Sequence, residues 1–157
     1  MLHSIKGLVA SLLWLALGGF ALAADTPASA VTDVLTPARE KIAAKNWAGA
    51  IDDLKRINAV GNADWNNLMG YSLRKATAPD LAAAEKFYNE ALRINPKHRG
   101  ALEYSGELYL MLGDLAKAEQ RLAALDKACM LPCEEYTDLK KAVARFKAAG
   151  NKYVAAP

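Results

Sequence analysis

The sequence predicts an all-α protein in which helix pairs stack side by side. The stretch DLAAAEKFYNEALRINP, residues 80–96, forms one amphipathic pattern, because its apolar residues fall on a single helical stripe. The same stripe occurs once before and once after this stretch, and corresponding residues of the three copies are equally spaced along the sequence. Such self-similarity indicates a repeat architecture. Four positions carry this period: Trp47, Leu81 and Leu115; Ala50, Ala84 and Ala118; Leu54, Tyr88 and Leu122; Ile57, Ala91 and Leu125.

A helix-capping residue stands directly before each copy of the stripe. Asn46, Asp80 and Asp114 share the spacing of the stripe itself. Asn and Asp side chains accept hydrogen bonds from the free N–H groups of a first helical turn. We therefore expect three helices that begin in register, each with a partner helix upstream.

The start of the chain is expected to be a secretory signal peptide over residues 1–23. A basic residue precedes an apolar run over residues 8–22, and the small residues Ala21 and Ala23 predict cleavage after Ala23. An uncleaved membrane anchor is the alternative, because the run is about as long as the shorter spanning helices. Residues 24–32 are rich in Ala, Ser, Thr and Pro and are expected to form a flexible linker. The localisation that follows is periplasmic or secreted.

The charge of the mature chain is nearly balanced. A surface that binds nucleic acid needs a strong basic excess, so we expect no nucleic-acid partner. The sequence has no second apolar run of spanning length, so we expect no membrane contact after signal cleavage.

The repeat domain is expected over residues 33–148. Two glycines, Gly70 and Gly106, lie in the middle of the first helices of its second and third pairs, predicted over residues 64–75 and 100–112. A glycine inside a helix costs about 1 kcal/mol relative to alanine, so we expect the paired helix to cross closely at both positions. The expected parts are repeats of about 31–62, 63–98 and 99–132, a capping helix over 134–148 and a tail over 149–157.

The pattern resembles the tetratricopeptide repeat. One unit carries the match through Met69-Gly70, Leu81, Ala84, Tyr88, Ala91 and Pro96, and the next through Gly106, Tyr109, Gly113, Leu115, Ala118 and Leu122. The similarity covers about Val31 to Pro132; the first unit departs from the pattern, and Met130 stands where proline would be expected. The resemblance implies a right-handed superhelix, an α-solenoid of about three tetratricopeptide helix pairs, whose concave groove holds a peptide or protein segment. It also implies an adaptor or scaffold that is rarely an enzyme.

The groove residues are expected on each first helix, about one turn apart on the side away from the second helix. The candidates are Asn67, Tyr71 and Arg74 in the second unit, and Glu103, Glu107 and Leu110 in the third. Amide, aromatic and guanidinium groups suit a peptide backbone, an apolar contact and a carboxylate. The alternatives are ordinary solvated helix residues, or an internal charge pair between Arg74 and the two glutamates. These acidic residues also argue against the carboxylate-binding clamp of some family members.

The two cysteines, Cys129 and Cys133, are expected to form a structural disulfide at the start of the capping helix. An exported chain with an even number of cysteines favours pairing, and Pro132 permits a turn between them. The alternative is a thiol- or copper-handling accessory protein, since two thiolates and the Met130 thioether suit Cu(I).

Catalysis has little support in the sequence. His3 leaves with the signal, and His98 lies in a polar turn where we expect it to be solvated. The sequence lacks a metal-binding His pair, a Gly-rich phosphate loop and a nucleophile motif, so we expect no enzyme, no cofactor and no metal. The expected partner is a protein or peptide, or a second copy of this chain in a homo-oligomer.

Overall fold

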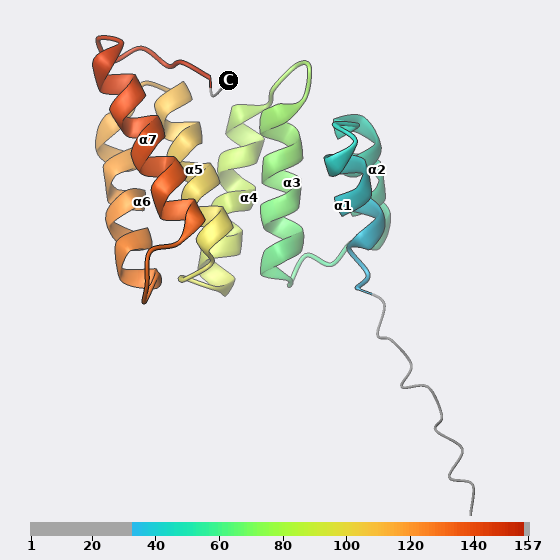
Figure 1. The fold of residues 1–157 in the computed structure, drawn as a ribbon. Helices are drawn as coiled ribbons and strands as arrows, with labels where there is room; N and C mark the ends of the chain where they lie inside the picture. The colour runs from blue at the N-terminus through green and yellow to red at the C-terminus, as the bar shows by residue number, and fades with distance from the viewer. Residues whose placement is uncertain (1–32, 156–157) are drawn as a thin grey trace, which may run out of the picture. The chain divides into compact units, whose positions relative to one another are not determined.

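The computed structural model describes residues 33–155 and shows them as seven α-helices without a β-strand in that range (Figure 1). The signal peptide and linker predicted over residues 1–32 lie outside the described residues. The helices are α1 (Thr36–Ala43), α2 (Trp47–Ile57), α3 (Ala63–Lys75), α4 (Leu81–Ile94), α5 (Arg99–Met111), α6 (Leu115–Ala128) and α7 (Glu134–Ala148). No helix in residues 33–155 has the length and apolar character needed to cross a membrane.

The helices form antiparallel pairs, α1 with α2, α3 with α4 and α5 with α6, which stack in chain order (Figure 1). Each second helix also packs against the first helix of the next pair. The last helix, α7, lies against both α5 and α6. This is the predicted α-solenoid of helix pairs.

The predicted capping residues begin the second helix of each pair. Each side-chain oxygen accepts a hydrogen bond from the backbone N–H three residues later, which satisfies one of the free donors of the first turn. The pairs are Asn46 with Gly49 at 3.0 Å, Asp80 with Ala83 at 2.9 Å, and Asp114 with Lys117 at 3.0 Å.

The repeated alanines let the helices approach closely. Ala50, Ala84 and Ala118 are all fully buried. The larger buried side chains divide into two apolar clusters. The first cluster is smaller and joins α1, α2 and α3 through Leu35, Ala38, Leu54, Trp65, Leu68 and Met69. The second cluster runs from α4 to α7, and Leu73 packs against both.

Both mid-helix glycines lie where another helix approaches closely, but the approaching helix differs. A Cβ on Gly70 would lie 2.8 Å from the Tyr88 ring and 3.1 Å from the Ala84 carbonyl oxygen, so the paired helix α4 crosses there as predicted. A Cβ on Gly106 would lie 2.5 Å from Leu139 of α7. The prediction of a crossing by the paired helix is therefore wrong at Gly106, because α7 occupies that position.

The end of α7 follows from two residues with positive φ. Gly150 and Asn151 have φ of 67° and 60°, and their backbone N–H groups bond to the carbonyls of Lys147 and Phe146. These bonds satisfy carbonyls that the helix leaves free at its end. The backbone conformation at Gly150 and Asn151 therefore ends α7.

Candidate functional site

The predicted groove residues other than Leu110 lie on neighbouring faces of α3 and α5. We call this surface the α3–α5 face and define it by Asn67, Tyr71, Arg74, Glu103, Tyr104 and Glu107. The spacing of about one turn on each helix brings these side chains together. Three of these six residues are more buried than solvated groove residues would be: Asn67 is 7%, Arg74 4% and Glu103 9% exposed.

Three aromatic rings form a row across this face. The Tyr71 ring lies 5.8 Å from the Trp47 ring in an edge-to-face arrangement and 4.6 Å from the Tyr104 ring. Such pairs stabilise each other beyond the area that they bury. Tyr104 was not among the candidate groove residues, and its place beside Tyr71 was missed.

Arg74 forms an internal ion pair. Its Nη2 lies 2.8 Å from Oε2 of Glu107, and its Nε donates a hydrogen bond of 3.3 Å to the Tyr88 hydroxyl. Burial by itself would lower the pKa of the Arg74 guanidinium, but Tyr88 and Glu107 hold that pKa above its usual value. The guanidinium also lies 5.5 Å from the Tyr71 ring centre and 5.7 Å from that of Tyr104. Its contacts thus match the alternative of an internal charge pair rather than a carboxylate-binding residue.

Leu110 does not lie on an open surface. Its side chain is 1% exposed and belongs to the same buried cluster as Leu139, Val143 and Phe146 of α7. The expectation that Leu110 faces a groove is therefore wrong, because α7 packs against α5.

Asn67 has an unsatisfied amide. Its Oδ1 is buried and has no hydrogen-bond partner among the residues that the structure describes. A Cβ on Gly100 would lie 3.2 Å from Asn67 Nδ2 and 3.7 Å from the Tyr104 ring, so the amide sits between α3 and the start of α5. Burying a polar group without a partner costs about 1–3 kcal/mol, which marks this amide as a candidate ligand contact.

The C-terminal segment lies close enough to the Arg74–Glu107 pair for their charges to act on Tyr153. Tyr153 follows α7 and is 39% exposed. Burial, and then the Glu107 carboxylate, raises the pKa of its hydroxyl, while Arg74 and Arg145 lower it. The segment after α7 turns back toward the other helices in Figure 1.

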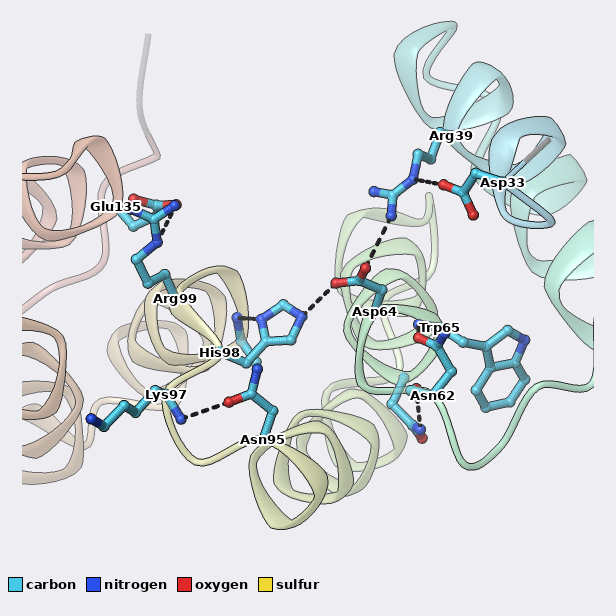
Figure 2. Close-up of polar contacts among 12 residues, drawn as sticks. Asp33, Arg39, Asn62, Asp64, Trp65, Asn95, Lys97, His98, Arg99 and Glu135 are labelled. Carbon is cyan, nitrogen blue, oxygen red and sulfur yellow. Dashed lines mark hydrogen bonds and ion pairs between the residues drawn. The ribbon is translucent and has the colours of Figure 1, made fainter. Parts of the chain in front are cut away.

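His98 is a structural residue rather than a solvated one. Its Nδ1 accepts a hydrogen bond from the Ala101 backbone N–H at 3.1 Å and thereby caps α5. The other ring nitrogen, Nε2, then carries the proton and donates to Asp64 Oδ1 at 2.9 Å. Figure 2 shows this contact between α3 and α5. The expectation of a solvated His98 is wrong because histidine takes the capping role that Asn62 has in α3.

Ion pairs extend this contact along one end of the first helices (Figure 2). Arg39 of α1 lies between Asp33, at 3.2 Å, and Asp64 of α3, at 3.4 Å. Arg99 at the start of α5 reaches Glu135 of α7 at 3.5 Å. These contacts link successive first helices, and their exposure makes each one worth little on its own.

The two cysteines lie at disulfide-bonding distance. The Sγ atoms of Cys129 and Cys133 are 2.04 Å apart, and Cys133 directly precedes α7. In this state neither sulfur is a thiolate, the form that binds a soft metal. The loop that they close exposes Met130 and Leu131 almost completely.

Residues 77–129, which contain α4, α5 and α6, match the family model of the tetratricopeptide repeat. No curated protein matches the chain. The match covers the second helix of one pair and the whole of the next, where the packing positions Ala84, Tyr88 and Ala118 lie. Repeats of this kind generally mediate protein–protein interaction.

Proposed function

Because residues 77–129 match the tetratricopeptide repeat family, we propose that this chain is a non-enzymatic module that binds an extended peptide segment of another protein on its α3–α5 face. The family is generally non-enzymatic, and its members commonly serve as adaptors. The function that follows is to hold one protein next to others in a complex.

The observation that carries this proposal is the unsatisfied amide of Asn67 beside the aromatic row. Its Oδ1 is buried and has no partner within the described part of the chain, so a rotation of the side chain toward the surface would let it accept a hydrogen bond from a backbone N–H of a bound peptide. Tyr71 and Tyr104 lie next to it and offer flat apolar surfaces. Aromatic side chains of this kind dominate the energetics of many interfaces.

The proposed setting is the cell envelope, as an adaptor or scaffold in the periplasm or in a secreted complex. It rests on the signal-peptide pattern of residues 1–23. Cell fractionation, with mass analysis of the N-terminus of the recovered protein, tests it. A mature N-terminus at Ala24 in the periplasmic fraction or the medium is expected; an intact N-terminus would contradict it.

The binding proposal is tested by panning a library of random peptides on the purified chain and measuring the affinity of enriched peptides by calorimetry. We expect Asn67→Ala and Tyr71→Ala each to weaken binding by about 10-fold or more, as for central interface residues. Gln120→Ala is the control, because Gln120 is exposed on α6, away from this face. The proposal is overturned if no peptide is enriched, or if enriched peptides bind both variants as tightly as the original chain.

A further inference from the structure

A small acidic cavity lies at the junction of α5 and α7. Its volume is about 230 Å³, and Glu103, Tyr104, Glu134, Glu135 and Asp138 line it. Four of these five side chains are carboxylates, contributed by two helices that pack against each other. The cavity therefore concentrates negative charge next to the α3–α5 face, of which Glu103 and Tyr104 are part.

Glu103 is the most buried carboxylate of this cavity. It is 9% exposed, and it forms neither an ion pair nor a hydrogen bond with any residue in the range 33–155. Two neighbouring acidic residues do have basic partners, since Glu107 pairs with Arg74 and Glu135 with Arg99. Asp138 contacts Lys141 on the outside of α7. Ionising a carboxyl group in so shielded a position is costly, and an external cation would compensate the charge.

The same charges act on the ionisation of Glu103. Burial, together with the carboxylates of Glu107, Asp138 and Glu135, raises the pKa of Glu103 to about 8, although Arg74 lowers it. Without a ligand the carboxyl group is thus largely protonated near neutral pH. A bound cation would favour the charged form and release the proton.

An organic cation fits the cavity better than a metal ion does. Within the described residues no group of three or more His, Cys, Asp or Glu side chains is arranged to hold a metal. Tyr104 lines the cavity beside the four carboxylates, and the lining is almost entirely polar, which suits an ammonium or guanidinium group that donates hydrogen bonds. Lysine and arginine side chains carry such a group at the end of a long apolar stem, which extends from a backbone that stays outside the cavity.

We propose that this cavity binds the side chain of a lysine or arginine in the peptide held on the α3–α5 face, with Glu103 as its principal counter-charge. The inference rests on the proposed function and names the residue type that the partner segment must present. Its geometry is continuous with that function, because Asn67 and Tyr104 both approach Gly100 at the start of α5. A peptide backbone at Asn67 thus lies beside the entrance to the acidic cavity.

The experiment titrates the isotope-labelled chain with Nα-acetyl-lysine methylamide and follows backbone amide shifts by NMR. We expect saturable shifts around Glu103, Tyr104 and Asp138, and a loss of affinity of about 10-fold or more in Glu103→Gln, as for a charge-assisted contact. The matched control is Glu40→Gln, because Glu40 is exposed on α1. Nα-acetyl-glutamine methylamide is the neutral control ligand.

The outcomes separate this inference from the proposed function. Saturable shifts with the lysine probe alone, lost in Glu103→Gln, support the basic-residue cavity. The inference is overturned if both probes give the same shifts, if Glu103→Gln binds the lysine probe unchanged, or if calcium chloride alone shifts these amides. In those cases enriched peptides that still require Asn67 and Tyr71 would leave the peptide-binding function standing. If the library yields no binders, the proposed function fails, whatever the probe does.

Discussion

The Arg74 guanidinium and the Glu107 carboxylate lie 2.8 Å apart between α3 and α5, with side-chain exposures of 3% and 21%. This contact joins the first helices of two successive pairs across the α3–α5 face. It also neutralises the Arg74 guanidinium, which the sequence suggested as a group that could bind a carboxylate of the ligand. The carboxylate of a partner therefore has no open guanidinium at Arg74, whereas a cation would meet the Glu103 carboxyl group at the acidic cavity, where Glu103 pairs with no basic residue in the range 33–155.

Replacing Arg74 by methionine should destabilise the protein by about 3 kcal/mol, measured by urea unfolding. The change leaves the Glu107 carboxylate and the Tyr88 hydroxyl without their partner, and breaking one side of a buried pair typically costs about 3–5 kcal/mol. The double variant Arg74→Met, Glu107→Leu should recover part of this loss. The exposed Arg93–Glu90 pair is the control, and Arg93→Met should leave stability nearly unchanged. Equal effects of Arg74→Met and Arg93→Met would contradict the internal ion pair.

Gly70→Ala should destabilise the protein by about 1–3 kcal/mol, measured as a lower thermal midpoint. The new Cβ would lie 2.8 Å from the fully buried Tyr88 ring and 3.1 Å from the backbone of α4, and overpacking at such contacts costs more than helix propensity returns. Gly61→Ala is the matched control, because a Cβ there meets nothing within 4 Å. A neutral or stabilising Gly70→Ala would show that α3 and α4 can separate at this crossing without cost.

His98→Ala should lower stability by about 1–2 kcal/mol, the usual cost of losing a helix cap. His98→Asn should recover most of that loss, because asparagine also accepts from the Ala101 N–H, although it loses the Nε2 contact with Asp64. Lys97→Ala, in the same turn and exposed, should have little effect. Chemical unfolding of the three variants measures this order. If His98→Ala is as stable as the unchanged protein, the assignment of His98 as a stabilising cap of α5 is contradicted.

The raised pKa of Glu103 predicts a pH-dependent difference between the original chain and Glu103→Gln. The folded state holds this proton up to a pKa of about 8, whereas the unfolded chain releases it near 4.5. The folded state therefore binds more protons than the unfolded state between these values, and the contribution of Glu103 to stability falls as pH rises through that window. After allowance for solvent screening, Glu103→Gln should match the original chain near pH 5 and exceed its stability by about 1–2 kcal/mol near pH 9. Unfolding curves at both pH values check this; a constant difference would mean that the carboxyl group titrates normally.

The helices and their starting points were predictable because their determinants are local. The cap at Asp80 and the stripe through Ala84 and Tyr88 lie within one segment, and both have their expected roles in the structure. The register of the repeats then follows from the constant spacing of these caps and stripes along the chain. Local signals of this kind do not depend on how distant segments pack.

The errors in the predicted site residues have a different cause, the packing of segments that are distant in the sequence. Leu110 is buried, and the space beside Gly106 is occupied by Leu139 of α7 instead of by the paired helix. Both follow from the packing of α7 against α5, and α7 lies outside the repeats from which the pattern was derived. The acidic cavity was missed for the same reason, since Asp138 of α7 meets Glu103 of α5 only after this packing. His98 was misjudged because a histidine cap is rarer than the Asn or Asp caps that the pattern repeats.

The division of the buried apolar side chains into two clusters implies unequal local opening along the chain. Detaching α1 and α2 exposes only the smaller cluster, which those helices share with α3, and leaves the packing of α4 to α7 intact. Amide protons of α1 and α2 therefore exchange with solvent through partial opening, whereas those of α5 exchange only through global unfolding. Trp47 of α2 rests on Tyr71, so a ligand that covers these two rings would slow exchange in the first pair as well as at its own contacts.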